Sequence, residues 1–209
     1  MIKRFLIADD HAIFREGIKQ VIASTSGQAM VEEAATGVEA VKKVAANRYD
    51  LVLLDISMPG RNGLDILMEL KRIRPEVAVV MLSMYPEEQY AIRAFRAGAS
   101  GYVTKGCSPG ELLTAMQRVM SGKKYVSPAL AEVLVSTEGG GEKPLHMDLS
   151  NREYQVLCML ASGKTLSRVA AELTLSIKTV STHRAHLLKK MNLQNNAELT
   201  RYALEHQLV

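Results

Sequence analysis

The first 121 residues alternate between two periods of hydrophobic positions. Five short runs have the length and composition of buried strands: FLIA at 5–8, MVEEA at 30–34, LVLLD at 51–55, VAVVMLS at 77–83 and SGYVT at 100–104. Apolar residues at helical spacing lie between these runs: Ile13, Ile18, Val21 and Ile22, then Val38, Val41 and Val44, then Leu64, Leu67 and Leu70. The alternation predicts an α/β unit with a parallel five-stranded sheet covered by helices on both faces.

The pattern changes after residue 121. Residues 122–148 contain one short helical pattern after Pro128, followed by three consecutive glycines and Pro144. Because glycine and proline at this density disfavour a packed helix or strand, this segment is predicted to be a flexible linker. Residues 149–209 show no strand pattern, and their periodicity predicts a small all-α domain.

Helix ends in this last segment are marked by capping residues. Ser150 and Glu153 form the pattern of a capping box, and Gly163 ends the helix that follows. After a second short helix, Ser176 is the predicted N-cap of a longer one that runs to Met191, and a final helix follows Asn195 and Asn196. The apolar residues predicted to face inward are Val156, Leu157, Leu160, Val169, Ala170, Leu173, Val180, Leu187, Leu188, Leu199, Tyr202 and Leu204.

Positive charge is concentrated in the same segment. The chain has 26 Lys and Arg against 22 Asp and Glu, a net charge of +4. Residues 150–209 carry 8 basic and 4 acidic residues, whereas residues 1–121 carry 15 and 14, and residues 122–149 carry 3 and 4. A compact basic unit is typical of nucleic-acid binding, although a solvated helical surface gives the same count.

Cysteine spacing and hydropathy exclude several classes of protein. Cys107 and Cys158 show no CxxC or Cys/His spacing, which excludes a disulfide scaffold and a thiolate zinc site. No apolar run approaches the roughly 20 residues that cross a bilayer, and the first apolar stretch is too short for a signal peptide. These features predict a cytoplasmic protein that does not interact with membranes.

Polar side chains gather at the predicted carboxyl edge of the sheet, where open parallel sheets carry their chemistry. Asp9 and Asp10 end the first strand, and Asp55 ends the third. Ser83 ends the fourth strand, and Lys105 follows the fifth. An aspartate at such a junction is, taken singly, more often a helix cap than a ligand, but the agreement of four strand ends indicates a functional site.

Three converging carboxylates repel one another unless a cation neutralises them, and oxygen ligands without Cys or His favour Mg²⁺. A phosphoryl group would then be held by the metal, by Lys105 and by the Ser83 hydroxyl. We therefore predict transfer of a phosphoryl group to a carboxylate. Asp55 is the expected acceptor because it stands alone on the central strand, facing the other pair.

These residues lie in runs that resemble the receiver domain of bacterial two-component response regulators: IADDH at 7–11, LLDISMPGRNG at 53–63, LS at 82–83 and YVTK at 102–105. The resemblance implies a flavodoxin-like receiver over residues 1–121, in which a sensor histidine kinase phosphorylates Asp55. It implies Mg²⁺ ligands at Asp9, Asp10, Asp55 and Ser57, a switch pair at Ser83 and Tyr102, and a phosphoryl contact from Lys105. Gly106 departs from the family, in which many members have proline there.

The segments 165–173 and 176–190 are separated by a turn of about three residues, the spacing of a helix-turn-helix. They lie in a region that resembles the DNA-binding domain of the LuxR/NarL (FixJ) group. Its diagnostic parts are L-S-x-R-E at 149–153, V-A-x-x-L at 169–173 and S-x-K-T-V-x-x-H at 176–183. The resemblance implies that residues 149–209 bind double-stranded promoter DNA, with a homodimer favoured when the receiver is phosphorylated.

The second of these helices is the predicted recognition helix. Ser181, Thr182 and Ala185 are expected to face the major groove. The residues expected to reach phosphates are Lys178, Thr179, His183, Arg184 and Lys189. Small hydroxyls and an alanine make few bidentate base contacts, so we expect modest specificity per half-site. His183 has an alternative role in packing, and the remaining histidines, His11, His146, His186 and His206, show no ligand spacing and are expected to be structural or exposed.

The two domains together predict a phosphorylation-controlled transcriptional regulator that is not an enzyme. Phosphorylation would reorient Ser83 and Tyr102, and so alter dimerisation and the exposure of the recognition helix. Aspartyl-phosphate phosphohydrolases use a similar site, but they commonly have an acid two residues after the nucleophile, where this chain has Ser57. A regulator that works without phosphorylation is a third alternative, which the complete acidic set disfavours.

Overall fold

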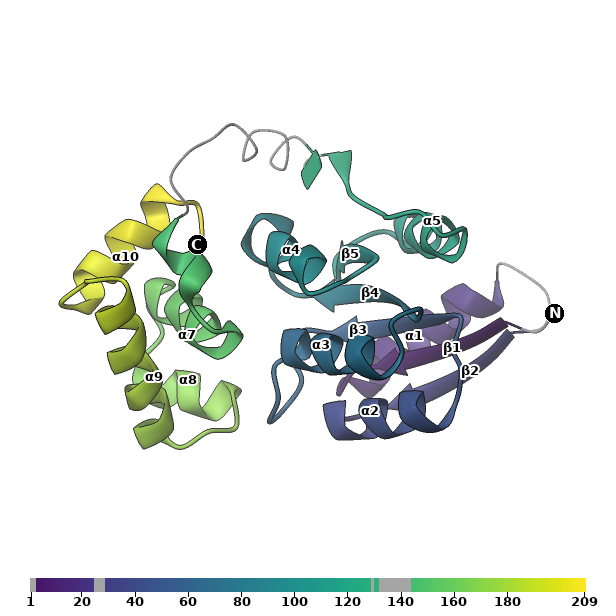
Figure 1. The fold of residues 1–209 in the computed structure, drawn as a ribbon, viewed down its shortest axis with the longest axis horizontal. Coiled ribbons are helices and arrows are strands. Elements are labelled where there is room, and N and C mark those ends of the chain that lie inside the picture. The colour runs from purple at the N-terminus through teal and green to yellow at the C-terminus, as the bar shows by residue number, and fades with distance from the viewer. Residues whose placement is uncertain (1–2, 25–28, 129, 132–143) are drawn as a thin grey trace. The chain divides into compact units, whose positions relative to one another are not determined.

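The protein is described by a computed structural model, which covers residues 3–24, 29–128, 130–131 and 144–209. The chain divides into two compact units, Met1–Val133 and Leu134–Val209. The first unit alternates strands and helices (Figure 1): β1 (Lys3–Ala8), α1 (Ala12–Ala23), β2 (Ala29–Ala34), α2 (Gly37–Ala46), β3 (Leu51–Asp55), α3 (Gly63–Ile73), β4 (Ala78–Ser83), α4 (Glu87–Arg96), β5 (Gly101–Thr104) and α5 (Pro109–Met120). The predicted boundaries at 121/122 and 148/149 remain predictions.

The five strands form one parallel sheet, as predicted, and the structure gives their order as β2-β1-β3-β4-β5. Helices α1 and α5 cover one face, and α2, α3 and α4 cover the other (Figure 1). Every residue of the central strand β3 is buried, because apolar side chains pack against it from both faces. The parallel α/β architecture expected from the alternating pattern and the flavodoxin-like fold implied by the resemblance are therefore both confirmed.

Two apolar positions predicted from helical spacing do not belong to the core. Ile18 and Ile22 of α1 are buried against the sheet, but Ile13 is 90% exposed. In α2, Val44 is buried whereas Val38 is 52% exposed. Both exposed residues lie in the first turn of their helix. An apolar residue at the right helical spacing therefore need not contact the sheet when it lies at a helix start.

The chain after α5 returns to the sheet. The Tyr125 amide donates to the Ser100 carbonyl at 2.9 Å, and Tyr125 forms a parallel bridge with Gly101. A helical conformation begins at Pro128, as predicted, and Leu130 is buried. The first part of the predicted linker is thus packed on the receiver-like unit, while Gly139, Gly140 and Gly141 lie outside the described residues.

The second unit is helical in its described part: η1 (Leu145–Asp148), α7 (Asn151–Ala161), α8 (Leu166–Glu172), α9 (Ile177–Lys190) and α10 (Asn196–Glu205). Ser150 and Glu153 form the predicted capping box, and Gly163 has the positive φ of a helix C-cap, +82°. Of the predicted inward residues, Leu204 is wrong because it is 60% exposed; Ala203 and Leu208 are buried there instead.

The remaining histidines and the cysteines agree with expectation. His146 is buried and its Nδ1 lies 3.0 Å from the Tyr202 hydroxyl, while His186 and His206 are exposed. Neither Cys107 nor Cys158 forms a disulfide within the described residues. Across the described part of the chain, we find no helix with both the length and the apolar character needed to cross a bilayer.

Candidate functional site: an acidic pocket and a helix-turn-helix

Strand register brings the two principal carboxylates together. Ala8 pairs with Leu54 between β1 and β3, so that Asp9 leaves its strand beside Asp55. Both aspartates are fully buried, and Asp10 is partly exposed. Pairing of Asp55 with Leu82 places Ser83 one residue farther along β4, at the same sheet edge. The strand register therefore brings these side chains together at the carboxyl edge of the sheet, as predicted.

Lys105 joins the two buried carboxylates. Its Nζ lies 2.7 Å from Asp9 Oδ2 and 2.9 Å from Asp55 Oδ2, and its side chain is only 5% exposed. The Phe14 ring lies under the ammonium, with its centroid 4.9 Å from Nζ. The backbone of Lys105 is fixed by its amide, which donates to the Ser83 carbonyl at 2.7 Å. Gly106 therefore does not prevent the lysine from reaching the acidic pair.

Burial and charge act in opposite directions on this pair. Burial raises the pKa of Asp55 above its ordinary value, and the nearby Asp9 carboxylate adds to this, against the lowering effect of Lys105. Burial acts to lower the pKa of Lys105, but the charges and hydrogen bonds of Asp55 and Asp9 outweigh it and raise that pKa. The pocket thus holds a charged lysine against two carboxylates in a desolvated environment.

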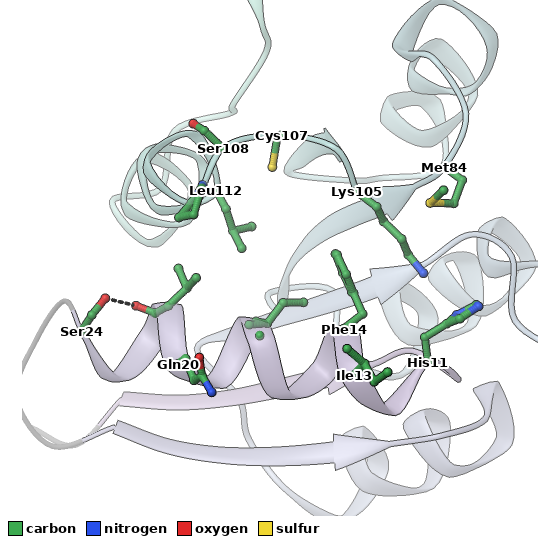
Figure 2. Close-up of a pocket in the computed structure, with 14 residues that line it drawn as sticks. His11, Ile13, Phe14, Gln20, Ser24, Met84, Lys105, Cys107, Ser108 and Leu112 are labelled. Atoms are coloured by element: carbon green, nitrogen blue, oxygen red, sulfur yellow. Dashed lines mark hydrogen bonds between the residues drawn. The ribbon is translucent and has the colours of Figure 1, made fainter.

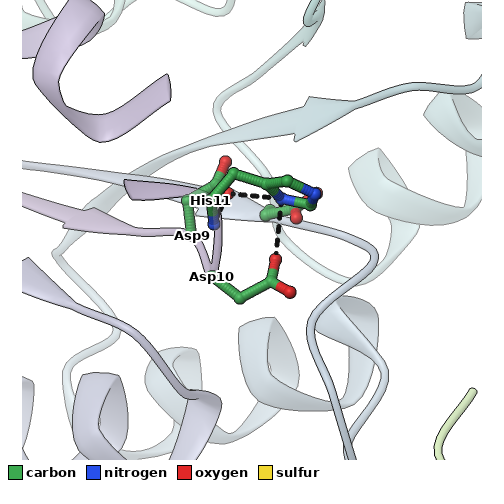
Figure 3. A group of neighbouring side chains, drawn as sticks. Asp9, Asp10 and His11 are labelled. Atoms are coloured by element: carbon green, nitrogen blue, oxygen red, sulfur yellow. Dashed lines mark hydrogen bonds and ion pairs between the residues drawn. The ribbon is translucent and has the colours of Figure 1, made fainter. Parts of the chain in front are cut away.

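His11 also belongs to the acidic pocket, and its place there was not predicted from sequence spacing. Its Nδ1 lies 2.9 Å from Asp10 Oδ1 and 3.2 Å from Asp9 Oδ1 (Figure 3). One ligand atom from each of Asp9, Asp10, His11 and Asp55 lies within 4.8 Å of the others. The signal was present in the sequence, because His11 directly follows the aspartate pair and is the N-cap residue of α1. His11 is exposed, as expected, and its ring nitrogen contacts two carboxylates of the acidic site.

The loop after Asp55 packs tightly against it. The Ser57 amide donates to Asp55 Oδ1 at 3.1 Å, which orients the carboxylate. Farther along, a Cβ at Gly63 would lie 2.3 Å from the Asp55 carbonyl oxygen, so only glycine fits where α3 begins. The Ser57 hydroxyl is buried without a hydrogen-bond partner among the described residues. This loop therefore orients Asp55 through a backbone amide and contains one buried hydroxyl that lacks a partner among the described residues.

Ser83 of β4 and Tyr102 of the neighbouring strand β5 are both fully buried. The Ser83 hydroxyl accepts a hydrogen bond from the Tyr85 amide at 2.9 Å. The Tyr102 hydroxyl donates to the Tyr85 carbonyl at 3.2 Å and also lies 3.5 Å from the Pro86 carbonyl oxygen. Both hydroxyls of the predicted switch pair thus contact the backbone of Tyr85, in the loop between β4 and α4. The Tyr102 side chain is buried in this structure.

An apolar groove of about 800 Å³ adjoins the acidic pocket (Figure 2). It lies between α1 and the segment that joins β5 to α5, with Phe14, Val21 and Leu112 along its wall. His11 and Lys105 line both the groove and the acidic pocket. The exposed Ile13 and Met84 border it, the latter 72% exposed. This groove was not predicted from the sequence, because its walls come from segments about ninety residues apart.

Helices α8 and α9 form a helix-turn-helix as predicted. Ser176 caps α9 by accepting from the Thr179 amide at 3.0 Å. In the turn, Thr174 has a φ of +54°, a left-handed conformation that β-branched residues seldom adopt. The buried residues Val180, Leu187 and Leu188 hold α9 on the unit, as the periodicity predicts.

The predicted DNA-contacting residues divide into two groups. Lys178, Ser181, Thr182, Ala185 and Lys189 are exposed along one side of α9. The others are partly buried and engaged: Thr179 Oγ1 lies 2.8 Å from Ser176 Oγ, and Arg184 Nε donates to Asn196 Oδ1 at 2.7 Å. Burial, with the charge of Arg152, lowers the pKa of His183, which favours its packing role.

Lys190 is exposed, like its neighbour Lys189, but its side chain also reaches a buried carboxylate of another helix. Its Nζ lies 2.7 Å from Glu153 Oε2, a carboxylate that is only 4% exposed. Burial acts to raise the pKa of Glu153, but Lys190 and hydrogen bonds from Ser150 outweigh it and lower that pKa. Lys190 therefore ties the end of α9 to the start of α7, a role that helical spacing could not distinguish.

Two family profiles match this chain, one in each of its two units. The family profile described as "Response regulator receiver domain" matches residues 5–117 of this chain. The chain belongs to the response regulator family. A second profile, "Bacterial regulatory proteins, luxR family", matches residues 147–203, so this response regulator joins a receiver to a LuxR-type DNA-binding domain.

Relatives of this response regulator match along nearly their whole length. Response regulator UvrY of Escherichia coli O6:H1 is 35% identical over 205 residues, which cover 97% of this chain and 94% of UvrY. Response regulator GacA of Pseudomonas protegens is 34% identical over 208 residues, covering 99% and 97%. A structure of RcsB from Salmonella typhimurium superposes with a TM-score of 0.61 at 26% identity, covering 98% of this chain and 99% of RcsB.

Proposed function

We propose that Asp55 accepts a phosphoryl group from the phosphohistidine of a sensor kinase, and that this controls binding to promoter DNA. The observation that carries the proposal is the buried arrangement of Asp9, Asp55 and Lys105, with Nζ–O distances of 2.7 and 2.9 Å. Two desolvated carboxylates and a lysine at a sheet edge stabilise the fold poorly. Their arrangement is instead suited to a dianionic group that the lysine can bind.

The residues around Asp55 fit Mg²⁺, which we propose as the cofactor. Asp9, Asp10 and Asp55 provide carboxylate oxygens, and Ser57, two residues after Asp55, has a buried hydroxyl without a partner among the described residues. When bound, the ion would neutralise these carboxylates and the oxygens of an incoming phosphoryl group. His11 stands at the rim of this set, 2.9 Å from Asp10.

In the transfer step, a carboxylate oxygen of Asp55 forms a bond to phosphorus while the bond from phosphorus to the donor imidazole breaks. The electron pair of the broken bond stays on the imidazole nitrogen. Lys105 gives up one of its carboxylate contacts to bind a phosphoryl oxygen, and the Ser83 hydroxyl leaves the Tyr85 amide to donate to another.

The second unit would bind double-stranded DNA through α9. The exposed side of this helix carries two lysines with small residues between them, which suits a major-groove helix that is held by phosphate contacts. RcsB, which this chain resembles, has been studied for its DNA interaction. Phosphorylation would favour a homodimer on paired half-sites, and the protein would act in the cytoplasm as a regulator without enzymatic turnover.

Intact mass tests the phosphorylation step. After incubation with Mg²⁺ and a small-molecule phosphodonor, the wild type should gain one phosphoryl group and Asp55→Asn none. Asp65→Asn, which changes an exposed aspartate of α3, is the control and should behave as the wild type. No adduct on a folded wild type would contradict the proposal and favour a regulator that works without phosphorylation. Turnover of a generic phosphate ester would instead favour a phosphohydrolase.

A further inference from the structure

The segment that follows α5 is attached to the receiver at two places of different character. The first attachment is the backbone bridge of Tyr125 to β5, where the Tyr125 side chain is only 8% exposed. The Tyr125 hydroxyl lies 3.3 Å from Glu111 Oε1 of α5. A Cβ on Gly101 would lie 3.3 Å from Tyr125 Cβ, so the absence of a side chain lets this segment pack closely on the strand. This attachment depends on burial and holds the segment to the sheet edge.

The second attachment is a polar contact with α4. The Ser127 hydroxyl donates to Glu87 Oε2, and Glu87 is the first residue of α4. The same Ser127 oxygen accepts from the Leu130 amide at 3.2 Å, so it caps the helix that begins at Pro128. One hydroxyl therefore connects the start of α4 with the start of the helical segment at Pro128.

The start of α4 is in turn connected to the phosphoryl site. Ser83, at the end of β4, holds the Tyr85 amide at 2.9 Å, and Tyr85 is two residues before Glu87. If the Ser83 hydroxyl turns to a phosphoryl oxygen, the Tyr85 amide loses this partner and the short loop to α4 must rearrange. A displacement of Glu87 would break its contact with Ser127, because a hydrogen bond fails beyond about 3.5 Å.

We infer that the Glu87–Ser127 contact is the link through which phosphorylation of Asp55 changes the exit of the chain from the receiver. The inference rests on the proposed function, since it requires a phosphoryl group at Asp55. In the unmodified protein the contact holds the helix at Pro128 in one orientation. In the phosphorylated protein the contact is broken, while Tyr125 keeps the segment attached to β5. Loss of the contact thus changes the orientation of this segment on the receiver without detaching it from β5.

The test uses the full chain and variants at both ends of the contact. Glu87→Ala and Ser127→Ala each remove the Glu87–Ser127 hydrogen bond. The double variant tests whether the effects of the two substitutions on the DNA-affinity response are non-additive, as expected for one shared contact. Glu87→Gln and Ser127→Thr are the matched controls, because an amide oxygen still accepts and a threonine hydroxyl still donates. Glu87→Ala is the more informative loss variant, because it leaves the helix-capping hydroxyl of Ser127 in place.

Three measurements are made on each protein before and after treatment with Mg²⁺ and acetyl phosphate: intact mass, hydrogen exchange of residues 125–131, and affinity for a DNA site selected from a random library by the wild type. We expect all variants to be phosphorylated alike. The wild type should show a DNA-affinity response of roughly 5-fold or more on phosphorylation, together with faster exchange after Ser127. In Glu87→Ala, exchange should be fast before phosphorylation, and the affinity response should fall below about 2-fold.

The double variant should change the response no further than either single variant, and the two conservative variants should respond as the wild type. The inference is overturned if Glu87→Ala becomes phosphorylated and retains the full wild-type response, or if Glu87→Gln loses the response as completely as Glu87→Ala. Absence of an adduct on the wild type is a different outcome, which removes the proposed function and this inference with it. Intact mass therefore separates the two failures.

Discussion

The two units of this protein place their functional charges in opposite environments. In the receiver, Asp9 and Asp55 are fully buried and Lys105 is 5% exposed. In the DNA-binding unit, the lysines at 178 and 189 are exposed, and buried residues only support the helix that carries them. Group transfer needs desolvated charges held before the reactant arrives, whereas binding to DNA phosphates needs cations that water can reach. The same residue type, lysine, therefore has opposite energetic consequences in the two units.

The largest expected effect concerns stability in the receiver. Lys105→Met removes the cation between two buried carboxylates, and should lower the free energy of unfolding by about 3–5 kcal/mol. Lys189→Met, which changes an exposed lysine of α9, should alter it by no more than about 0.5 kcal/mol. Urea unfolding followed by circular dichroism measures both. Equal losses of unfolding free energy in the two variants would show that a buried lysine contributes no more to stability than an exposed one.

The next effect lies inside the DNA-binding unit. Glu153→Gln weakens the contact of a buried carboxylate with Lys190, and should cost about 1–3 kcal/mol at pH 7. Because the folded-state pKa of Glu153 is lowered, the stabilisation is complete above pH 4.5 and is lost as the pH falls through the folded-state value. Urea unfolding at pH 7 and at pH 3.5 should show the difference between wild type and variant shrink in acid. Glu172→Gln, on the surface, should cost less than about 1 kcal/mol.

Of the two adjacent lysines of α9, Lys189 is expected to contribute to DNA binding and Lys190 to stability. Lys189→Ala should lower DNA affinity for all sequences alike and reduce the slope of log affinity against log salt by about 0.9. Lys190→Ala should leave that slope nearly unchanged but lower thermal stability, since Lys190 is bound to Glu153. Fluorescence anisotropy at several salt concentrations, with a melting curve for each variant, measures both properties. A loss of salt slope in Lys190→Ala alone would contradict the assignment.

Base readout should be weak. Ser181, Thr182 and Ala185 offer few bidentate contacts, so no single base-pair change in a selected site should cost more than about 3 kcal/mol. Competition binding with every single substitution of the selected site measures this directly. One position that costs clearly more would mean that a partly buried residue, such as Arg184, leaves Asn196 to contact a base.

The smallest expected effect is a pH dependence from His183. Burial lowers its pKa below 6.5, so the unfolded chain binds more protons than the folded protein as the pH falls. The DNA-binding unit should therefore lose stability between pH 7.5 and 5.5, and His183→Gln should lose less over the same interval. Melting curves at the two pH values test the difference. An unchanged pH dependence in the variant would show that His183 titrates as it does in water.

Local patterns in the sequence were sufficient for the architecture. Alternating apolar runs predicted all five strands, and caps such as Ser150, Ser176 and Gly163 predicted where helices begin or end, because capping depends on residues within one turn. The same logic placed Asp9, Asp55, Ser83 and Lys105 at one sheet edge, since parallel strands direct their carboxyl ends together. These features depend on residue order and on periodicity, which are properties of the chain alone.

Contacts between distant segments were decided only by tertiary packing. Sequence spacing did not indicate that Lys190, the neighbour of Lys189, reaches Glu153, which is 37 residues away. His11 joined the acidic pocket through the turn into α1, and Ser127 reached Glu87 across 40 residues. Periodicity states which side of a helix a residue occupies, but not which side chain from another segment meets it there. The fold of each unit follows from the sequence, whereas the pairing of its charges follows from how the elements pack.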